Sequence, residues 1–357
     1  MTRSGREAYK DELAAIAAGN EQIICIEADL GGKNHPFQQQ HPERFFNLGI
    51  AELASVDIAA GLAEAGYVPF FSTFAAFAAL RAAESVKLTM GYMGKNVKVV
   101  AAYGGVSGGW FGTTHHALED IAVIQSFQNI RIACPHGEEE TRRVIREAAA
   151  SAEPYYIRLG RNDAYDSLPR EEGVSCRDIL VEGGRGFAAT DGIANREVRA
   201  AHADHADHAA HADHADHADH ADHADHAEAH PAPLCLVSVG EQATELCKEI
   251  VQNDPSLVHA HLCYVDIQSL QDSLPALSSL SHKLLVVEEH RATGGTASYL
   301  ALQLPEHRVY SHHCGEQWPI YGGTHAEVLS YLGFGLQPLQ QQISEIIGGS
   351  THGIQRT

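Results

Sequence analysis

The 357-residue chain has no run of 18 apolar residues, and this absence argues against a transmembrane helix. Basic residues are also few, since 25 lysines and arginines face 46 aspartates and glutamates and give a formal charge of −21. This balance argues against a nucleic-acid backbone or an anionic membrane surface as the main partner. The start MTRSGREAYKDEL is unlike a signal peptide, so we expect a cytoplasmic protein.

The seven cysteines never occur with CxxC spacing and are odd in number, which disfavours a disulfide framework or a zinc site. Several of them lie inside apolar, strand-like runs such as IICIEA and HLCYVDI. We therefore expect buried free thiols in a reducing compartment.

One segment has almost no apolar side chain larger than alanine. Between residues 202 and 230 the sequence repeats Ala-Asp-His and holds 10 of the 24 histidines and eight of the 46 acidic residues. A period of three forms no apolar face on a helix or a strand, so we expect a disordered low-complexity insert over residues 191–232. Weak binding of zinc, nickel or copper by the repeat is the alternative.

Elsewhere, apolar runs alternate with stretches of helical length. Strands are predicted at residues 22–28, 97–103, 130–134, 155–159, 234–239, 261–267 and 283–288. Helices are predicted at residues 49–65, 74–90, 137–150, 241–252 and 295–303. This alternation is typical of βαβ units around a mostly parallel sheet. We expect two three-layer α/β domains, residues 1–165 and 233–348, with a connection at residues 166–190.

The segment FFNLGIAE places one carboxylate, Glu52, near the start of a helix that is otherwise rich in Ala, Ile, Leu and Val. The helix dipole alone could favour an acidic residue there. Alternatively, an apolar setting would raise its pKa and allow proton exchange near neutrality.

Two further segments could carry chemistry. In PFFSTFAAF, Phe74 and Phe77 share a helix face and form either core packing or a stacking surface for a heteroaromatic ring. In YGGVSGGWFGTTHH, five glycines follow a predicted strand, but the spacing matches neither a dinucleotide fingerprint nor a P-loop. A glycine-rich loop in this position is still where α/β sheets bind ligands. Its His115 could exchange protons or could simply be a solvent-exposed loop residue.

Together these segments resemble the pyrimidine-binding half of the transketolase family of thiamine-diphosphate enzymes. The resemblance runs from about Arg6 to Asn162 through ADL, GIAE, FFSTFAAF, GTTHHALED, ACP and YYIRLGRN. It continues more weakly through VVEEH at residues 286–290 and GFG at residues 333–335, which look like the C-terminal domain of the family. The chain is also similar to 1-deoxyxylulose-5-phosphate synthase.

The resemblance implies roles for five residues around the cofactor. Glu52 matches the glutamate that shares a proton with the aminopyrimidine and thereby activates the cofactor. Phe74 matches the aromatic residue that stacks on the pyrimidine, and Phe77 lies further along the same wall. Ile50 falls where an apolar residue supports the cofactor, and Asp29 where an acidic residue lies near it.

The resemblance also implies substrate contacts. His115 matches the histidine that contacts the substrate oxygen. Arg161, and less directly Arg158 and Arg6, fall on or near positions that grip a sugar phosphate, for which a guanidinium fork is suited.

The chain departs from the family in the glycine loop. Tyr103 and Gly104 replace a His-Asp pair, and Trp110 and Phe111 replace an acidic residue that senses a substrate hydroxyl. Trp110 and Phe111 would narrow the substrate channel and make it more apolar.

A further departure is that the chain contains no GDG motif, through which the family holds Mg²⁺ and the diphosphate. It also begins where the second family domain begins. We therefore expect no metal ligands in this chain and a partner subunit that carries GDG, in an α₂β₂ heterotetramer.

The expected function is that of the C-terminal subunit of a split transketolase that moves a two-carbon ketol or related acyl unit between sugar or keto substrates. The cofactors would be thiamine diphosphate and Mg²⁺. One alternative is a 2-oxoacid-decarboxylating, acyloin-forming or 1-deoxyxylulose-5-phosphate-synthase-like enzyme. The other is a non-catalytic scaffold or metal buffer that uses the histidine repeat.

Overall fold

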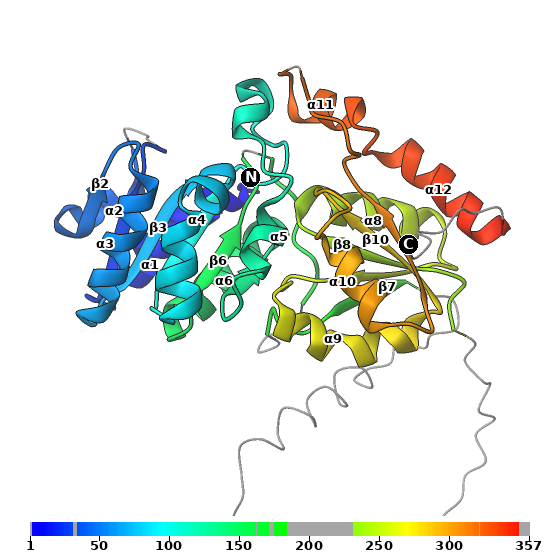
Figure 1. Cartoon of the computed structure of the whole chain (residues 1–357), viewed down its shortest axis with the longest axis horizontal. Coiled ribbons are helices and arrows are strands. Elements are labelled where there is room, and N and C mark those ends of the chain that lie inside the picture. Colours follow the sequence, from blue (N-terminus) through cyan, green and yellow to red (C-terminus); the bar gives the residue numbers. More distant parts are fainter. Residues whose placement is uncertain are drawn as a thin grey trace, which may run out of the picture.

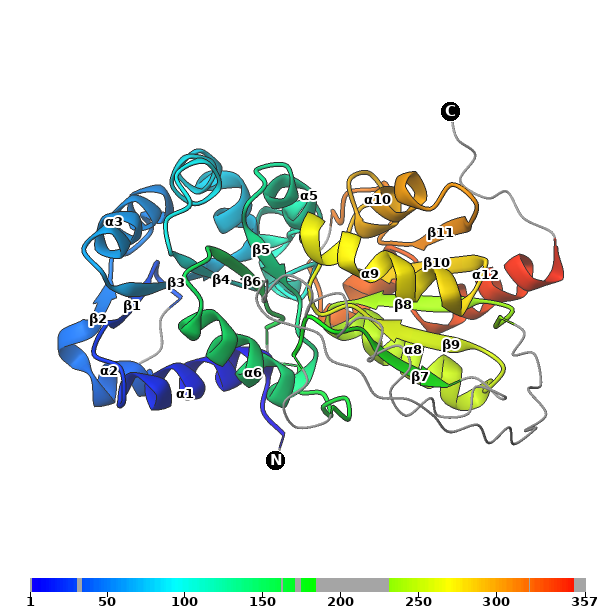
Figure 2. The same cartoon turned by 90° about the horizontal axis from the view of Figure 1, so that it is seen from below.

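The computed structural model describes residues 2–30, 34–161, 163–170, 175–183, 231–320 and 322–349. Two α/β lobes lie side by side, each with a sheet at its centre and helices on both faces (Figures 1 and 2). This arrangement confirms the predicted fold class. The histidine repeat and most of the predicted insert lie outside the described residues.

The first lobe has a six-stranded, fully parallel sheet in the order β2-β1-β3-β4-β6-β5. Its strands are β1 (Ile23–Glu27), β2 (Phe45–Asn47), β3 (Val68–Phe74), β4 (Lys98–Ala102), β5 (Arg131–Ala133) and β6 (Tyr155–Arg158). The predicted strands correspond to β1, β4, β5 and β6, whereas β2 and β3 were not predicted.

The helices of this lobe are α1 (Gly5–Ala17), α2 (Pro36–Gln40), α3 (Glu52–Glu64), α4 (Ala83–Ser85), α5 (Asp120–Gln125) and α6 (Gly137–Ala150). Ser4 and Glu7 form a capping box that starts α1. Successive residues of β1 point to opposite faces of the sheet, so Ile24 belongs to the apolar cluster that includes Val56 of α3, and Ile23 to the cluster that includes Leu13 of α1.

The predicted helix at residues 74–90 is only partly correct. Phe74 ends strand β3, and the chain then forms two π-helical segments, Phe77–Arg81 and Val86–Tyr92, on either side of the short α4. π-Helical turns frequently mark functional sites.

The second lobe has a five-stranded sheet in the order β11-β10-β8-β9-β7. Its strands are β7 (Leu180–Gly183), β8 (Cys235–Val239), β9 (Val258–His261), β10 (Lys283–Glu288) and β11 (Arg308–His312). Its helices are α8 (Glu241–Asn253), α9 (Ile267–Leu280), α10 (Thr296–Gln303), α11 (His325–Tyr331) and α12 (Leu336–Gly348). Strand β7 is antiparallel to β9 and lies in the segment predicted as a connection.

The strand predicted at residues 261–267 is displaced. β9 ends at His261, and the following residues cross to the first lobe, where Cys134 N donates to Cys263 O at 2.6 Å and Val265 N donates to Ile132 O at 2.9 Å. The apolar pattern of this run therefore reflects pairing with the edge of the other sheet.

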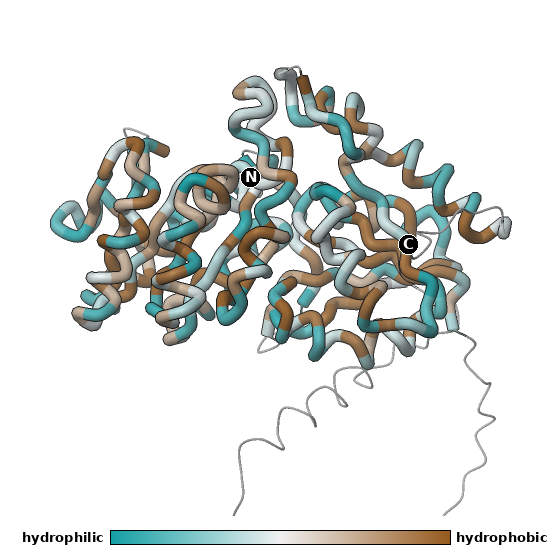
Figure 3. Tube along the Cα trace, viewed as in Figure 1, coloured by the Kyte–Doolittle hydropathy of each residue, from teal (hydrophilic) through white to brown (hydrophobic). Residues whose placement is uncertain are grey.

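Hydrophobic residues follow the strands inside both lobes (Figure 3). Within the described residues, no helix combines the length and apolar character needed to cross a membrane. All seven cysteines are buried and unpaired, which confirms their prediction as free thiols.

Candidate active site

The predicted site residues lie at one edge of the first sheet. Phe74 ends β3, while Asp29, Tyr103 and Arg161 follow the carboxyl ends of β1, β4 and β6. These four strands are neighbours in the sheet and run parallel, so their carboxyl ends meet. Glu52 opens α3 after the next strand, β2. Such an edge is where open α/β sheets bind ligands.

Phe74 is the centre of an aromatic cluster at this edge. Its ring centroid lies 5.4 Å from that of Phe77, 4.5 Å from Tyr103, 5.9 Å from Phe111 and 5.1 Å from His115. His115 also stacks on Phe111, with 5.0 Å between centroids. The structure thus brings together five residues that the sequence separates by up to 41 positions.

Glu52 is the buried carboxylate of the site, with 2% of the residue exposed. Its Oε1 accepts a hydrogen bond of 2.9 Å from Nη1 of Arg81, whereas its Oε2 is buried without a partner among the described residues. An unpartnered buried carboxylate oxygen is costly unless a ligand satisfies it. This oxygen can therefore bond to a group that enters the site.

Arg81 is a site residue that the sequence analysis missed. Its guanidinium lies 4.1 Å from the ring centroid of Phe77 and pairs with Glu52. The four-residue spacing from Phe77 was a signal that could have placed it on the same helix face. Arg81 connects the carboxylate to the aromatic cluster.

His115 is half-buried beside Arg81. Burial, and then the positive charge of Arg81, lower the pKa of His115 below its usual value of 6.5. Its Nδ1 lies 2.9 Å from Oγ1 of Thr114. The imidazole is therefore mainly neutral near pH 7 and can accept a proton.

Tyr103 lies between two arginines. Arg6 donates from Nη1 to the Tyr103 hydroxyl at 3.0 Å and from Nη2 to Leu30 O at 3.0 Å. The guanidinium of Arg161 lies 5.3 Å from the Tyr103 ring and 5.1 Å from that of Phe111. The Nε atoms of both arginines are buried without a partner among the described residues, so two donors remain for an anionic group.

The backbone is strained where two of these side chains leave their strands. Asp29 has φ of 51° and Tyr103 has φ of 63°, in the left-handed region that residues other than glycine rarely adopt. Strain of this kind clusters at functional sites. It supports the assignment of the site to this edge.

Four predicted residues, Arg158, Ile50, Trp110 and Asp29, are not part of the aromatic cluster. Arg158 is buried against Gly104 of the glycine loop, where Nε donates to Asp120 at 2.8 Å and Nη2 donates to Glu289 O at 3.0 Å, so its guanidinium joins the two lobes. Ile50 and Trp110 are exposed over 73% and 68% of their surface. Asp29 is exposed next to the site.

The second lobe holds the glycine loop in place through residues that the sequence analysis did not assign. Glu289 accepts a hydrogen bond of 2.6 Å from the backbone N–H of Val106. His325 lies between Glu289 at 3.0 Å and Asp163 at 2.7 Å, and their charges outweigh burial and raise its pKa to about 10. Gly105, with φ of 62°, must be glycine because a Cβ there would lie 2.2 Å from Glu289.

Within the described residues, one group of side chains could hold a metal ion. It consists of the buried Glu140, Cys176 and Cys263. Glu140 is already bonded to Arg170 and His261, and sulfur ligands do not suit Mg²⁺. This group therefore does not fit the magnesium ion of a diphosphate site.

Sequence comparison places the first lobe, which carries the candidate site, beside a known family. Residues 2–166 match the family described as the transketolase pyrimidine-binding domain. The chain is 33% identical over 183 residues to a subunit of the apulose-4-phosphate transketolase of Phocaeicola vulgatus, covering 50% of this chain and 59% of that protein. It is also 33% identical over 183 residues to the 6-deoxy-6-sulfo-D-fructose transketolase subunit SqwH of a Clostridium species, covering 50% and 57%.

The matches therefore span less than two thirds of these relatives. Among solved structures, a split-gene transketolase described as an inactive beta4 tetramer superimposes with a TM-score of 0.72 and 24% identity, over 98% of this chain and 100% of that one. This likeness establishes the fold across both lobes. Residues 2–166, the first lobe and the residues that follow its last strand, are therefore similar to the pyrimidine-binding domain of transketolases.

Proposed function

We propose that this chain is the C-terminal subunit of a split, thiamine-diphosphate-dependent transketolase that transfers a two-carbon ketol or related acyl unit. The observation that carries the proposal is the buried Glu52, whose Oε2 has no partner among the described residues. Arg81 connects Glu52 to Phe77 and to His115, whose pKa is lowered by burial and by Arg81, in a segment that matches the transketolase pyrimidine-binding domain.

The residues fit the pyrimidine half of thiamine diphosphate. Glu52 would bond to the ring nitrogen through Oε2, and Phe74 and Phe77 would supply the apolar wall, with Ile50 and Asp29 at its border. When bound, the cofactor supplies a nucleophilic carbon that carries the transferred unit. Glu52 would hold and release the proton that activates this cofactor, while neutral His115 would exchange a proton with a substrate oxygen.

The substrate end of the site favours an anionic sugar. Arg6 and Arg161 flank Tyr103 with unpartnered donors, and a guanidinium suits a phosphate or a sulfonate. The similar proteins are named for a sugar phosphate and a sulfo-sugar, which supports an anionic terminus. Phe111 and Trp110 would line a narrow, apolar entrance, and Arg158 would position the loop rather than touch substrate.

The missing half of the site is expected from a partner subunit. Mg²⁺ and the diphosphate would be held by an N-terminal chain that carries the GDG motif, in an α₂β₂ assembly. The names of similar proteins as subunits and as a split-gene transketolase support this partnership. Residues 233–348 would form the C-terminal transketolase-type domain, and the buried free cysteines suit a cytoplasmic enzyme.

An apolar surface next to Glu52 supports the same assembly. Helix α3 packs against both π-helical segments that follow β3, and these neighbouring elements carry exposed apolar side chains, which are typical of protein interfaces. On α3, on the turn before it, on the π-helical segments and directly after them, these side chains are Ile50, Leu53, Ile58, Leu80, Leu88, Tyr92 and Met93.

A 2-oxoacid-decarboxylating, acyloin-forming or 1-deoxyxylulose-5-phosphate-synthase-like enzyme is the second candidate, because two large aromatic side chains replace the residue that would sense a substrate hydroxyl. The test is to mix the chain with a GDG-bearing partner, thiamine diphosphate and Mg²⁺, and to compare ketose phosphates with pyruvate as donors. We expect turnover of a ketose phosphate. Turnover of pyruvate alone would support the second candidate, and no turnover by the assembled mixture would support a scaffold.

A further inference from the structure

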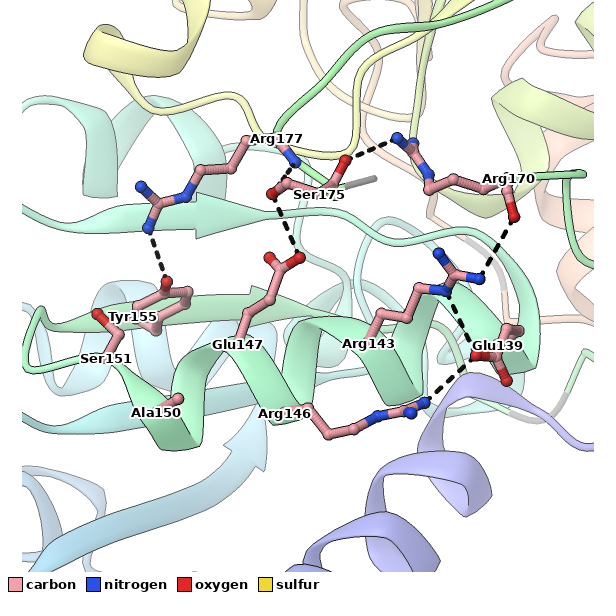
Figure 4. A pocket seen from close by; sticks show the side chains of 10 residues that line it. All are labelled: Glu139, Arg143, Arg146, Glu147, Ala150, Ser151, Tyr155, Arg170, Ser175 and Arg177. Atoms are coloured by element: carbon pink, nitrogen blue, oxygen red, sulfur yellow. Dashed lines mark hydrogen bonds and ion pairs between the residues drawn. The ribbon is translucent and has the colours of Figure 1, made fainter. Parts of the chain in front are cut away.

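Arginine donors can hold an anion only where no protein group already occupies them. The pocket in Figure 4, between α6 and the segment before β7, is lined by four arginines that each pair with a carboxylate. The Nε atoms of Arg6 and Arg161 are instead buried without a partner among the described residues. The contacts that hold these two side chains therefore decide how the candidate active site receives an anion.

Arg6 and Arg161 each follow a glycine that lies against the second lobe. Gly5 is the first residue of α1, and Gly160 comes shortly after strand β6. A Cβ at Gly5 would lie 2.8 Å from Oε1 of Glu241, and a Cβ at Gly160 would overlap Oε2 of the same residue. The carboxyl group of Glu241 therefore occupies the space that two side chains would otherwise fill.

Glu241 is the first residue of α8, so its carboxyl group reaches the first lobe from the second. It accepts a hydrogen bond from the backbone N–H of Gly160, while its Oε1 is buried without a partner among the described residues. Glycine has more backbone freedom than any other residue, so this bond removes motion that would otherwise pass to the next residue, Arg161. Glu241 thus fixes the backbone from which the Arg161 side chain projects.

The same carboxyl group acts on Arg6 through the start of α1. Arg6 leaves the helix one residue after Gly5, and its Nη1 donates to the Tyr103 hydroxyl at 3.0 Å. The guanidinium carbons of Arg6 and Arg161 each lie 5.3 Å from the centroid of the Tyr103 ring. One residue of the second lobe therefore contacts the backbone behind both arginines that flank this ring.

The charge of Glu241 is compatible with an anion site nearby. Burial, and then the charge of Asp163, raise the pKa of Glu241 to about 8. The carboxyl group is therefore mainly protonated near neutral pH, and it does not neutralise the guanidinium groups. Its contribution is one of shape and hydrogen bonding, which a glutamine side chain can reproduce.

We propose that Glu241 is a positioning residue that sets the spacing of Arg6 and Arg161 for the anionic end of the substrate. The second lobe would thereby contribute to substrate binding without touching the substrate. This inference rests on the proposed function, which assigns the two arginines to an anionic sugar.

The test is steady-state kinetics of the chain assembled with its GDG-bearing partner, with a ketose phosphate and the same ketose without phosphate as donors. E241A removes the carboxyl group, whereas E241Q keeps its shape without a charge. Q242A is the matched control, because Gln242 also joins α8 to the first lobe, where it accepts a hydrogen bond of 3.0 Å from the Tyr165 hydroxyl.

We expect E241A to raise the KM for the ketose phosphate by about tenfold, with little change in kcat, because only binding of the anionic end is weakened. The kcat/KM for the unphosphorylated ketose should stay close to that of the wild type. E241Q and Q242A should behave as the wild type does. If circular dichroism shows that E241A does not fold, E241D takes its place, since it withdraws the carboxyl group by one methylene. An equal loss with both donors, or an equal rise of KM in Q242A or E241Q, would overturn the proposal.

A second measurement separates this proposal from the proposed function. NMR signals of the arginine Nε–H groups report on Arg6 and Arg161 in the full chain without any turnover, and R6K and R161K assign them. We expect both signals to shift in E241A and to keep their positions in E241Q and Q242A. Unshifted signals in E241A would overturn the positioning role, whereas shifted signals in an enzyme that turns over no ketose would overturn the proposed function alone.

Discussion

At the scale of single residues, the site depends on one buried carboxylate with a partly satisfied hydrogen-bonding capacity. Glu52 receives one hydrogen bond from Arg81 and keeps Oε2 free of partners among the described residues. Burial lowers the pKa of His115 and Arg81 lowers it further, so one cation influences both groups that would exchange protons. The three side chains therefore act as a connected unit.

Replacing Glu52 with glutamine should keep the shape of the side chain and remove its ability to carry a proton. We expect E52Q to reduce turnover of the assembled enzyme by about 10²–10⁴-fold, the usual contribution of a positioned acid–base group. Steady-state kinetics of the mixture with the partner subunit measure this effect. E64Q is the matched control, because Glu64 ends the same helix and is exposed. Turnover of E52Q within threefold of that of E64Q would contradict the assigned role.

Glu52, Phe74, Phe77 and His115 could be predicted because each lies in a short motif with chemical meaning. Arg81 could not be assigned to Glu52, because 29 residues separate them and only the packing of α3 on the π-helical segments brings them together. Arg158 was expected near a sugar phosphate because its position in the sequence resembles a phosphate-binding position. Its guanidinium is instead buried against Asp120, and this pairing depends on tertiary structure that no local sequence pattern reveals.

At the scale of elements, the alternation of apolar runs with stretches of helical length predicted most strands and helices. It did not predict where a helix is interrupted or where a strand leaves its sheet. The segment after Phe74 has helical composition, yet it forms π-helical turns where it packs against α3. Strand β7 was missed because its four residues pair antiparallel at an edge, with little apolar pattern. The run after His261 was expected in one sheet, but it bonds to the other.

The start of helix α8 gives a pH-dependent prediction. Burial, and then the charge of Asp163, raise the pKa of Glu241 to about 8, and Glu289 adds to the shift while His325 opposes it. The unfolded chain loses the proton of Glu241 near the ordinary glutamate pKa of 4.5, whereas the folded protein keeps this proton up to about pH 8. This proton contributes stability at low pH that is lost as the pH rises from about 4.5 through about 8.

We expect E241Q to flatten this decline, which has a limiting slope of about 1.4 kcal/mol per pH unit. Urea unfolding between pH 5 and pH 8 measures it. His325, whose pKa is about 10, also stabilises the folded protein through its bound proton, and this stabilisation is lost as the pH rises from about 6.5 to about 10. In E241Q the free energy of unfolding should therefore still decline above pH 6.5, but less steeply than in the wild type. E249Q, at an exposed position of the same helix, is the control. An unchanged slope in E241Q would show that Glu241 is ionised in the folded protein.

At the scale of the whole molecule, the two-lobe α/β plan could be predicted because each lobe repeats the same strand–helix alternation. The contacts between the lobes could not be predicted, because they depend on single polar residues of the second lobe, such as Glu289 and His325, that reach the glycine loop. The candidate site contains the aromatic cluster around Phe74 and the Nε atoms of Arg6 and Arg161, which have no partner among the described residues. Within the described residues, the one potential metal group does not suit Mg²⁺.

We propose that this chain forms one half of a thiamine-diphosphate site, whose other half a partner subunit supplies. The most direct measurement is calorimetric titration of thiamine diphosphate with Mg²⁺ into the chain alone, and then into an equimolar mixture with a GDG-bearing N-terminal subunit. We predict weak binding and no turnover for the chain alone, and saturable, Mg²⁺-dependent binding with turnover for the mixture. Micromolar binding together with turnover by the single chain would contradict the account.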